Sequence, residues 1–304
     1  MNNTTYIDGK DILAEFGVIV TSGGYDSLLS YPSLKQVEYN NWPEEDGIEP
    51  DLSNPVLDTK NVEISFATQD YTKVGGIVEL VSDMAYHTFE FDFLGVERRL
   101  RLLGMPDLTL INNMGSFSLR FSDDFPLEGY VYLAPESNLL NGDYEIDGIN
   151  LSKYGCVVLK GTRANILESP DTKPGLTINS KYRAGADYDA GSVFFQTKNV
   201  DLNILLHANT KEEFWRNYNA LLYDISRPGS HVLFSEYLYE EFEFYYNSSK
   251  VNKLFVGNKD EVILNFILTI TFTSYRAEGV LSLLASESDE LIVSENDYAI
   301  ELNN

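Results

Sequence analysis

The sequence is poor in the residues on which disulfide-stabilised, metal-binding and membrane proteins depend. Its 304 residues include one cysteine, two tryptophans and three histidines. The single cysteine, Cys156, excludes an intramolecular disulfide and therefore a small secreted disulfide scaffold. No window approaches roughly 18 apolar residues, and the polar N-terminus has no signal-peptide core. We expect a protein that is made and kept in the cytosol, or that leaves it without a secretory signal peptide.

Positive charge is also scarce. Lysine and arginine number 22 against 47 aspartate and glutamate residues, so the formal net charge is -25. Affinity for nucleic acid comes largely from Lys and Arg that displace counterions, so we expect no tight binding to DNA, RNA or anionic membranes. A strongly acidic wall could still let DNA slide past without adhering.

The sequence contains no recognisable catalytic or metal-binding pattern. It has no Walker loop, dinucleotide fingerprint, nucleophile elbow or HExxH helix. His87, His207 and His231 lack metal-ligand spacing and are interpreted as ordinary surface or capping histidines. Cys156 lies in an apolar run and is predicted to be a small buried hydrophobe. We therefore expect no enzymatic activity, no cofactor and no metal, although carboxylate pairs of the glycosidase kind stay open in so acidic a chain.

An internal repeat organises the chain. The segment from Ile7 to Gly9 recurs from Ile146 to Gly148, and Thr59-Lys60-Asn61-Val62 recurs intact at 197–200. Between them a constant offset of 138 residues aligns Gly17 with Gly155, Gly23 with Gly161, Pro32 with Pro170, Lys35 with Lys173 and Gly47 with Gly185. Because glycine and proline fix turn geometry, this agreement predicts two copies of one fold. We predict domains at 1–140 and 141–276, joined by a short linker over 136–143, and an acidic docking segment at 277–304.

Hydrophobic periodicity predicts a mainly β (α+β) protein. Residues 62–66, 117–121, 200–204 and 262–272 alternate apolar with polar positions, as half-buried strands do. Apolar residues at helical spacing follow the 62–66 and 200–204 strands, at 77–84 and at 214–225, and Thr210 with Glu213 forms a plausible capping box. The sequence therefore predicts two tandem β-sandwich or barrel domains, each with one packed helix.

Several segments of the first half resemble phage tail proteins. They are residues 6–12, Phe16-Gly17, 42–47 and 57–60, and they are similar to the distal tail and tail-tube-like proteins of long-tailed phages and prophages. The second half follows only through the repeat, and it has Ser180 at the position of Trp42. The resemblance implies a homo-oligomeric ring, a trimer or hexamer, that surrounds a channel in the virion tail. It also implies contacts with other tail and baseplate proteins, synthesis in the host cytoplasm and DNA that passes without specific binding.

The long loop from Gly23 to Pro55 is the candidate oligomer interface, with Tyr31, Trp42 and Pro43 as its proposed contact residues. An ordinary solvated loop is an equally good interpretation. Two other functions also stay open. A tandem carbohydrate-binding module or surface adhesin fits an acidic, Tyr-rich β protein, although two tryptophans are few for sugar platforms. A hydrolase acting on cell-wall polymers has no residue pattern in its favour.

Overall fold

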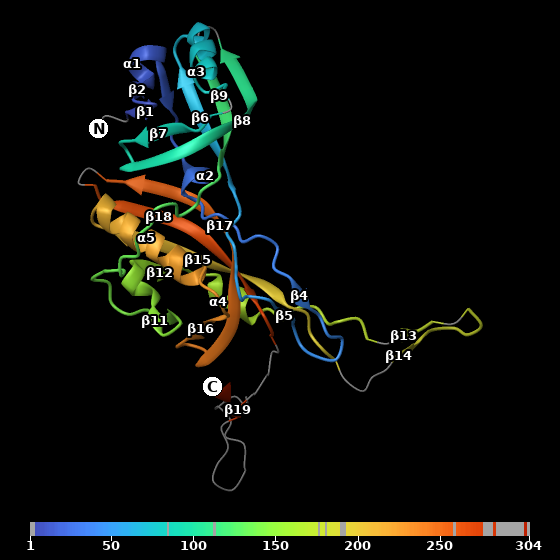
Figure 1. Ribbon diagram of the computed structural model, residues 1–304. Helices are drawn as coiled ribbons and strands as arrows, with labels where there is room; N and C mark the ends of the chain where they lie inside the picture. Colours follow the sequence, from blue (N-terminus) through green and yellow to red (C-terminus); the bar gives the residue numbers. More distant parts are fainter. Residues whose placement is uncertain are drawn as a thin grey trace.

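The structure is a computed structural model. It describes residues 4–83, 85–111, 114–175, 177–179, 181–188, 193–257, 260–275, 282–283 and 301–302. Figure 1 shows two β domains stacked along the long axis of the molecule, with two slender segments running beside and beyond the second one. No helix among these described residues is long and apolar enough to span a membrane.

The first domain is built on one seven-stranded sheet. Its strands are β1 (Thr5–Ile7), β2 (Lys10–Asp11), β3 (Val18–Val20), β6 (Lys60–Thr68), β7 (His87–Phe91), β8 (Val96–Ile111) and β9 (Met114–Asp123). Its helices are α1 (Ile12–Phe16), α2 (Asp26–Leu29) and α3 (Val74–Leu80), with a 3-10 turn at Tyr71–Lys73. The strands pair antiparallel in the order β2-β1-β7-β8-β9-β6-β3.

The second domain repeats this arrangement. Its strands are β10 (Tyr144–Ile146), β11 (Ile149–Asn150), β12 (Cys156–Val158), β15 (Lys198–Ala208), β16 (His231–Ser235), β17 (Glu240–Val256) and β18 (Val262–Phe272). Its helices are α4 (Thr162–Leu167) and α5 (Lys211–Ile225), with a 3-10 turn at Leu151–Tyr154. The strand order is β11-β10-β16-β17-β18-β15-β12, which is the order of the first sheet, element for element.

Three small two-stranded sheets complete the described structure. They pair β4 (Tyr39–Asn40) with β5 (Glu49–Pro50), β13 (Thr177–Ile178) with β14 (Asp187–Tyr188), and β19 (Ser282–Leu283) with β20 (Glu301–Leu302). The first two keep the offset of the sequence repeat at every residue. The predicted docking segment at 277–304 lies outside the described residues apart from β19 and β20, so it stays a prediction.

Equivalent positions in the two domains have equivalent surroundings. Val62 pairs with Phe121 across β6 and β9, and Val200 pairs with Ile270 across β15 and β18. Both valines are fully buried. The aligned glycines agree as well, because all six of Gly17, Gly23, Gly47, Gly155, Gly161 and Gly185 have positive φ. Such backbone conformations favour glycine, which explains why these residues keep the repeat visible in the sequence.

Helix α5 lies where the apolar spacing predicts it, whereas α3 overlaps the predicted 77–84 only at 77–80, and short additional helices accompany both. In α5, Thr210 accepts a hydrogen bond from the N–H of Glu213, while the Glu213 carboxylate accepts one from the N–H of Asn209. The cap thus forms, shifted by one residue from the usual box. Helix α3 begins before the predicted positions, includes Gly75 and Gly76, and ends at Leu80. Of its predicted apolar positions, Met84 lies outside the described residues.

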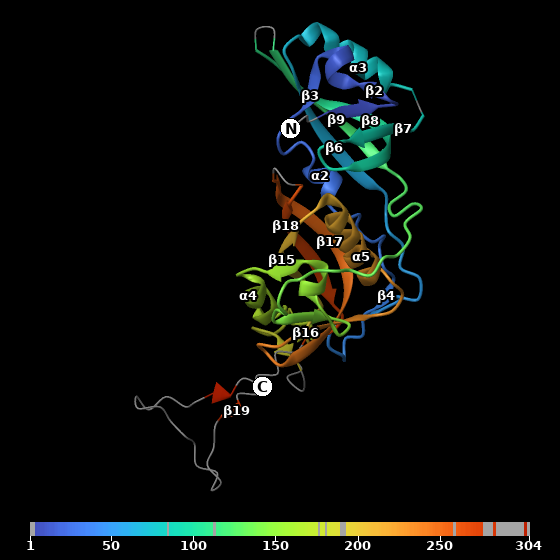
Figure 2. The same ribbon diagram turned by 90° about the vertical axis from the view of Figure 1, so that its left-hand side faces the viewer.

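The connection between the domains is longer than the predicted linker. It runs without helix or strand from Asp124 to Asp143 and lies along α5 (Figure 2). The fully buried amide of Asn217 on α5 clamps it by accepting from the N–H of Glu136 and donating to its carbonyl, at 2.8 and 2.9 Å. Two hydrogen bonds from one buried side chain fix this strand-free segment at a defined point of the second domain.

The two glycines of α3 give a matched stability test. A Cβ at Gly75 would meet nothing within 4 Å, whereas one at Gly76 would lie 3.0 Å from a ring carbon of Phe16. We expect Gly75→Ala to raise the free energy of unfolding by about 0.5–1 kcal/mol, because alanine loses less backbone entropy in a helix. Gly76→Ala should raise the free energy of unfolding by less than Gly75→Ala does, or should lower it. Urea unfolding of both variants measures this, and equal gains would contradict the close packing of α3 on α1.

Candidate functional site

The joint between the two domains is built from many polar contacts. We define arm 1 as residues 30–59, between α2 and β6, and arm 2 as residues 168–197, its counterpart in the second domain. Arm 1 leaves the first domain and lies along the second (Figure 1). Figure 2 shows the same course from the side.

Backbone hydrogen bonds join arm 1 to the second domain along its whole length. The N–H of Leu34 donates to the carbonyl of Asn247, and the N–H of Ile48 donates to that of Thr273, at 3.1 and 2.8 Å. Further on, Gly229 donates to the carbonyl of Leu52 at 2.8 Å. An extended segment that exchanges main-chain hydrogen bonds with another domain is the pattern of β-strand addition.

Asn247 can accept this bond because it sits in a β-bulge. The register of β17 on β18 shifts between Tyr246 and Ser248, which leaves Asn247 out of the ladder. A bulge residue has unpaired backbone groups, and these become available to another chain segment. Arm 1 uses the carbonyl that the bulge exposes.

The tip of arm 1 fits only because Gly47 has no side chain. A Cβ there would lie 1.9 Å from the carbonyl oxygen of Thr273. On its other side, Gly47 donates its N–H to Phe195 at the base of arm 2, at 2.8 Å. The buried ammonium of Lys173 donates to the carbonyls of Trp42 and Gly47 at 2.7 and 2.6 Å. One lysine of the second domain therefore closes the tip of arm 1 from the acceptor side.

At the base of arm 1, aromatic residues of both domains pack together. The ring of Tyr31 stacks on that of Tyr218 with 4.2 Å between centroids. Its hydroxyl donates to the Tyr218 carbonyl, and the Tyr218 hydroxyl donates in turn to the carbonyl of Leu29. Burial raises the pKa of both phenols well above its ordinary value, so both stay protonated donors. Tyr246 adds a bond of 2.8 Å to the carbonyl of Pro32.

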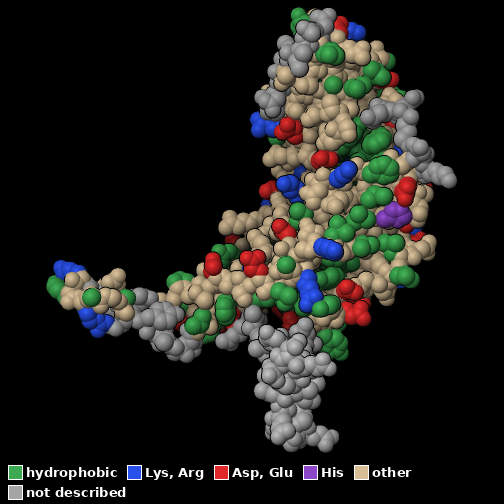
Figure 3. Space-filling view, turned by 180° about the vertical axis from the view of Figure 1, so that it is seen from behind, with side chains coloured by type: hydrophobic (Ala, Val, Ile, Leu, Met, Phe, Trp, Pro, Cys, Tyr) green, Lys and Arg blue, Asp and Glu red, His purple; other side chains and the backbone are tan. Residues whose placement is uncertain are grey.

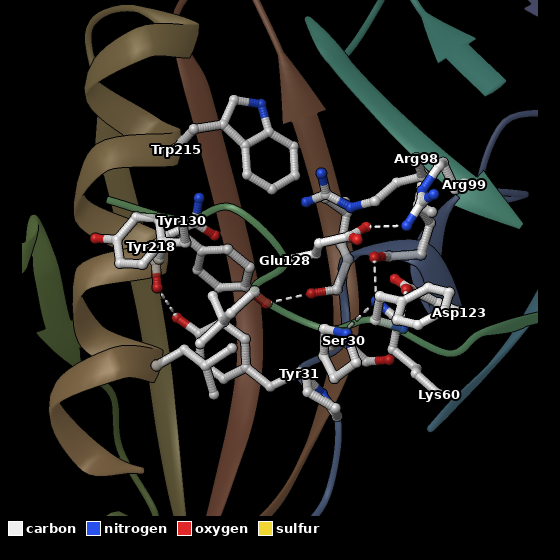
Figure 4. Close-up of a pocket in the computed structure, with 18 of the residues that line it drawn as sticks. Ser30, Tyr31, Lys60, Arg98, Arg99, Asp123, Glu128, Tyr130, Trp215 and Tyr218 are labelled. Carbon is white, nitrogen blue, oxygen red and sulfur yellow. Dashed lines mark hydrogen bonds and ion pairs between the residues drawn. The ribbon is translucent and has the colours of Figure 1, made fainter. Parts of the chain in front are cut away.

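A cavity of about 340 Å³ lies beside this contact (Figure 4). Trp215 of α5 donates its indole N–H to the carbonyl of Leu94 in the first domain at 2.8 Å, and the guanidinium of Arg98 lies 5.1 Å from the Trp215 ring centroid. Burial lowers the pKa of Arg98. Arg99 pairs with Glu128. Arg98, Arg99, Glu128 and Lys60 around this cavity are engaged with a ring, with one another or with carbonyls, as in a joint between domains.

The repeated tetrapeptide supplies a matching lysine to each domain. The ammonium of Lys60 donates to the carbonyls of Leu28 and Ser30 at the end of α2, at 2.7 and 3.0 Å. Lys198 donates to the carbonyls of Asn165, Ile166 and Glu168 at the end of α4. A cation at a helix C-terminus satisfies carbonyls that the helix leaves free. Burial lowers the pKa of both lysines to about 8.

Two histidines also occupy equivalent places, and our interpretation of them as surface or capping residues is wrong. His87 and His231 are each 4% exposed. Each places Nδ1 2.7 Å from the carboxylate of the aspartate in the repeated Asp-Gly turn, Asp8 or Asp147. Burial alone would raise the pKa of Asp8, but the hydrogen bonds from His87 and the backbone N–H of Thr88 outweigh it, and the pKa is lowered.

The other ring nitrogen of each of these histidines lies near an oxygen, but Nε2 of His87 has no hydrogen-bond partner among the described residues. Nε2 of His87 lies 2.9 Å from Asp83, and Nε2 of His231 lies 3.2 Å from the carbonyl of Arg227. Their arrangement is that of a structural tie between the turn and the next strand. His207 is half-exposed and pairs with Glu261, and Cys156 is buried, as predicted. Among the described residues, no group of three or more His, Cys, Asp or Glu could hold a metal ion.

The structure separates the three predicted interface residues. Tyr31 is 4% exposed and turned into the chain, so it contacts the second domain rather than the surface. Trp42 is 49% exposed, with its indole N–H bonded to Glu49, and Pro43 is exposed beside it. Their role between subunits stays a prediction. Lys173 and Gly47 were not predicted to be contact residues, although both occupy aligned positions of the repeat.

Comparison with known proteins adds one finding. No protein-family model and no curated protein matches the chain. Among solved structures, the crystal structure of the SPP1 Dit (gp 19.1) protein matches 88% of this chain and 98% of that chain, at 10% identity and a TM-score of 0.33. That protein is described as a paradigm of the hub adsorption apparatus in Gram-positive infecting phages. A TM-score this low carries no argument about the present chain.

Gly47 and Gly185 provide a matched test of the joint. Both have positive φ, but only Gly47 has an atom within 4 Å of its would-be Cβ. Gly185→Ala should cost about 1–2 kcal/mol of backbone strain. Gly47→Ala should cost the same strain and, in addition, detach the tip of arm 1 from Thr273 and Lys173. We expect lower thermal stability and faster proteolysis within arm 1 for Gly47→Ala in dilute protein. Equal behaviour of the two variants would contradict the docked tip.

The pKa of Lys60 predicts a pH dependence with a defined sign. Between about pH 8 and the ordinary lysine value of 10.5, the unfolded chain holds a proton at this position that the folded chain has released. The contribution of Lys60 to the free energy of unfolding therefore rises with pH in that window. Urea unfolding gives the free energy of unfolding of wild type and of Lys60→Met. We expect the wild-type value minus the variant value to increase from pH 8 to 10.5 and to stay constant below pH 7. A difference that falls with rising pH would show that burial does not lower this pKa.

Proposed function

We propose that this chain is a structural component of a phage or prophage tail, a ring-forming distal tail or tube-like protein that links the tail tube to the baseplate. The observation that carries the proposal is the tandem pair of domains with one strand order, each with a long arm, the first of which is docked on the neighbouring domain. Such a chain has a direction, because the arm of one domain docks on the next domain. Repetition of that contact in one direction builds rings or tubes.

The edge strands fit such an assembly. β3 and β12 are edge strands of their sheets, and their central residues, Ile19 and Val157, occupy the same repeat position. Both are more than 40% exposed. Exposed apolar edges favour pairing with further copies or with other tail proteins. We therefore assign homo-oligomer formation and contacts with tail and baseplate proteins to this function.

The charge of the chain fits a channel wall. A net charge of -25 repels the phosphates of DNA, so a lumen lined by this protein would let DNA pass during ejection without holding it. The role needs no catalysis, cofactor or membrane contact. It places the protein in the virion tail after synthesis in the host cytoplasm.

Phage particles from the genome that encodes this chain test the proposal. We expect the chain in purified tails by mass spectrometry, with an antibody that labels the tail end in electron micrographs. The purified protein should show rings by negative stain and a mass of three or six chains by light scattering. Absence from purified particles, together with a monomer that binds glycans on an array, would refute the proposal and support the carbohydrate-binding alternative.

A further inference from the structure

We propose that arm 2 docks on the first domain of a second copy of this chain, in the way that arm 1 docks on the second domain within the chain. The inference rests on the proposed ring-forming function and specifies the surface through which chains join. The repeat carries it, because the tip glycine, the lysine that binds the tip and the bulge that receives the arm each have a counterpart elsewhere in the chain. The counterparts on arm 2 and on the first domain lie at the surface.

Arm 2 has the features with which arm 1 docks. It carries Gly185 at the position of Gly47, with φ of 81° against 70°, and its hairpin β13–β14 repeats β4–β5 residue for residue. Among the described residues, no atom lies within 4 Å of the would-be Cβ of Gly185. The absent side chain leaves the same room for a close backbone approach that Gly47 uses.

The root of arm 2 shows the same contrast. Leu29, at the end of α2, is 1% exposed because the second domain covers it, whereas its counterpart Leu167, at the end of α4, is 46% exposed. Arm 2 extends beyond the second domain and away from the first (Figure 1), and Figure 3 shows it standing clear of the rest of the molecule. It is therefore directed away from the acceptor surface of its own chain.

The first domain has the matching acceptor surface. Its strand β8 carries a bulge between Leu102 and Gly104, at the place of the β17 bulge that receives Leu34. The bulge residue Leu103 is 47% exposed, and Met105 beside it is 44% exposed. A bulge leaves backbone groups outside the ladder, and exposed apolar side chains beside it favour binding of another segment.

A lysine completes the correspondence. Lys173, which holds the tip of arm 1, is buried, and its repeat counterpart Lys35, at the base of arm 1, is exposed. In the proposed contact Lys35 would donate to the carbonyl of Gly185 of the second copy, as Lys173 donates to that of Gly47. The proposed contact thus provides the exposed Lys35 with a carbonyl partner.

The two contacts differ at the base of the arm. Arm 2 has Ser169 where arm 1 has Tyr31, so no ring stacks at its base. The first domain instead offers Leu103 and Met105 where the second offers Asn247 and Ser249. Apolar area on the acceptor thus takes the place of an aromatic ring on the arm.

Engineered cysteines test the contact in the full-length protein, because the single native cysteine is buried. The internal contact of Leu34 with Asn247 has as its proposed intermolecular counterpart Thr172 with Leu103 of another copy. Leu103→Cys and Thr172→Cys, made in separate chains and mixed under oxidising conditions, should give a disulfide-linked dimer. Each variant oxidised alone is the control for symmetric cross-links. Leu34→Cys with Asn247→Cys in one chain should give a cross-link without a gain in mass.

Lys35→Ala is the second variant, with the exposed Lys153→Ala as its control. We expect Lys35→Ala to weaken self-association by roughly tenfold to a hundredfold, as for loss of a charged hydrogen bond, with unchanged thermal unfolding of the dilute chain. Lys153→Ala should change neither. Light scattering over a concentration series measures both variants.

The outcomes separate this inference from the function on which it rests. Rings that form without the mixed cross-link, and that tolerate Lys35→Ala, would overturn the docking of arm 2 and leave the tail role standing. A chain that stays monomeric at high concentration would overturn both. The mixed cross-link together with the loss caused by Lys35→Ala would support the docking directly.

Discussion

The joint between the domains depends on a backbone approach that leaves no room for a side chain. At Gly47, arm 1 lies so close to the carbonyl of Thr273 that a single Cβ would overlap it. The contact holds because Lys173 and Phe195 of the second domain also bind the same short tip. A backbone-to-backbone contact of this kind is specific in position and nearly independent of side chains. It can therefore be repeated wherever the chain repeats the glycine and the lysine.

Within each domain, too, a few polar contacts constrain the structure more tightly than the apolar core. Their cores are filled with interchangeable apolar residues, whereas the polar contacts are kept: the helix-capping ammonium groups of Lys60 and Lys198, and the Asp-Gly turns tied by His87 and His231. Apolar packing tolerates substitution of similar volume. A buried ammonium or imidazole without its partner is costly, so these few residues constrain both copies more tightly than the core does.

The features that depend on residues close together in the sequence could be predicted. Strands of alternating pattern, the helix at 211–225 and the turn glycines depend on neighbours in the chain. The repeat shows the strand patterns and the turn glycines twice. Prediction failed where the partner is distant in sequence. Tyr31 looked like an exposed loop aromatic, but its partner, Tyr218, lies 187 residues away on a helix of the other domain. His87 had no visible reason to be buried until its strand was placed beside the turn at Asp8. The helix at 74–80 includes two glycines at its start and ends before the predicted position 84.

Each chain has two arms, and arm 1 is already docked within the chain. In the proposed assembly, only the contact of arm 2 is left to form between chains. The internal contact is formed at an effectively fixed local concentration and carries a stacked tyrosine pair, so it exists before chains meet. The proposed external contact lacks that ring and depends on concentration. Assembly would then proceed from preformed two-domain units, with the arm carrying Ser169 as the reversible step. In the proposed assembly, the difference between Tyr31 and Ser169 would separate a permanent joint from one that forms only when enough copies are present.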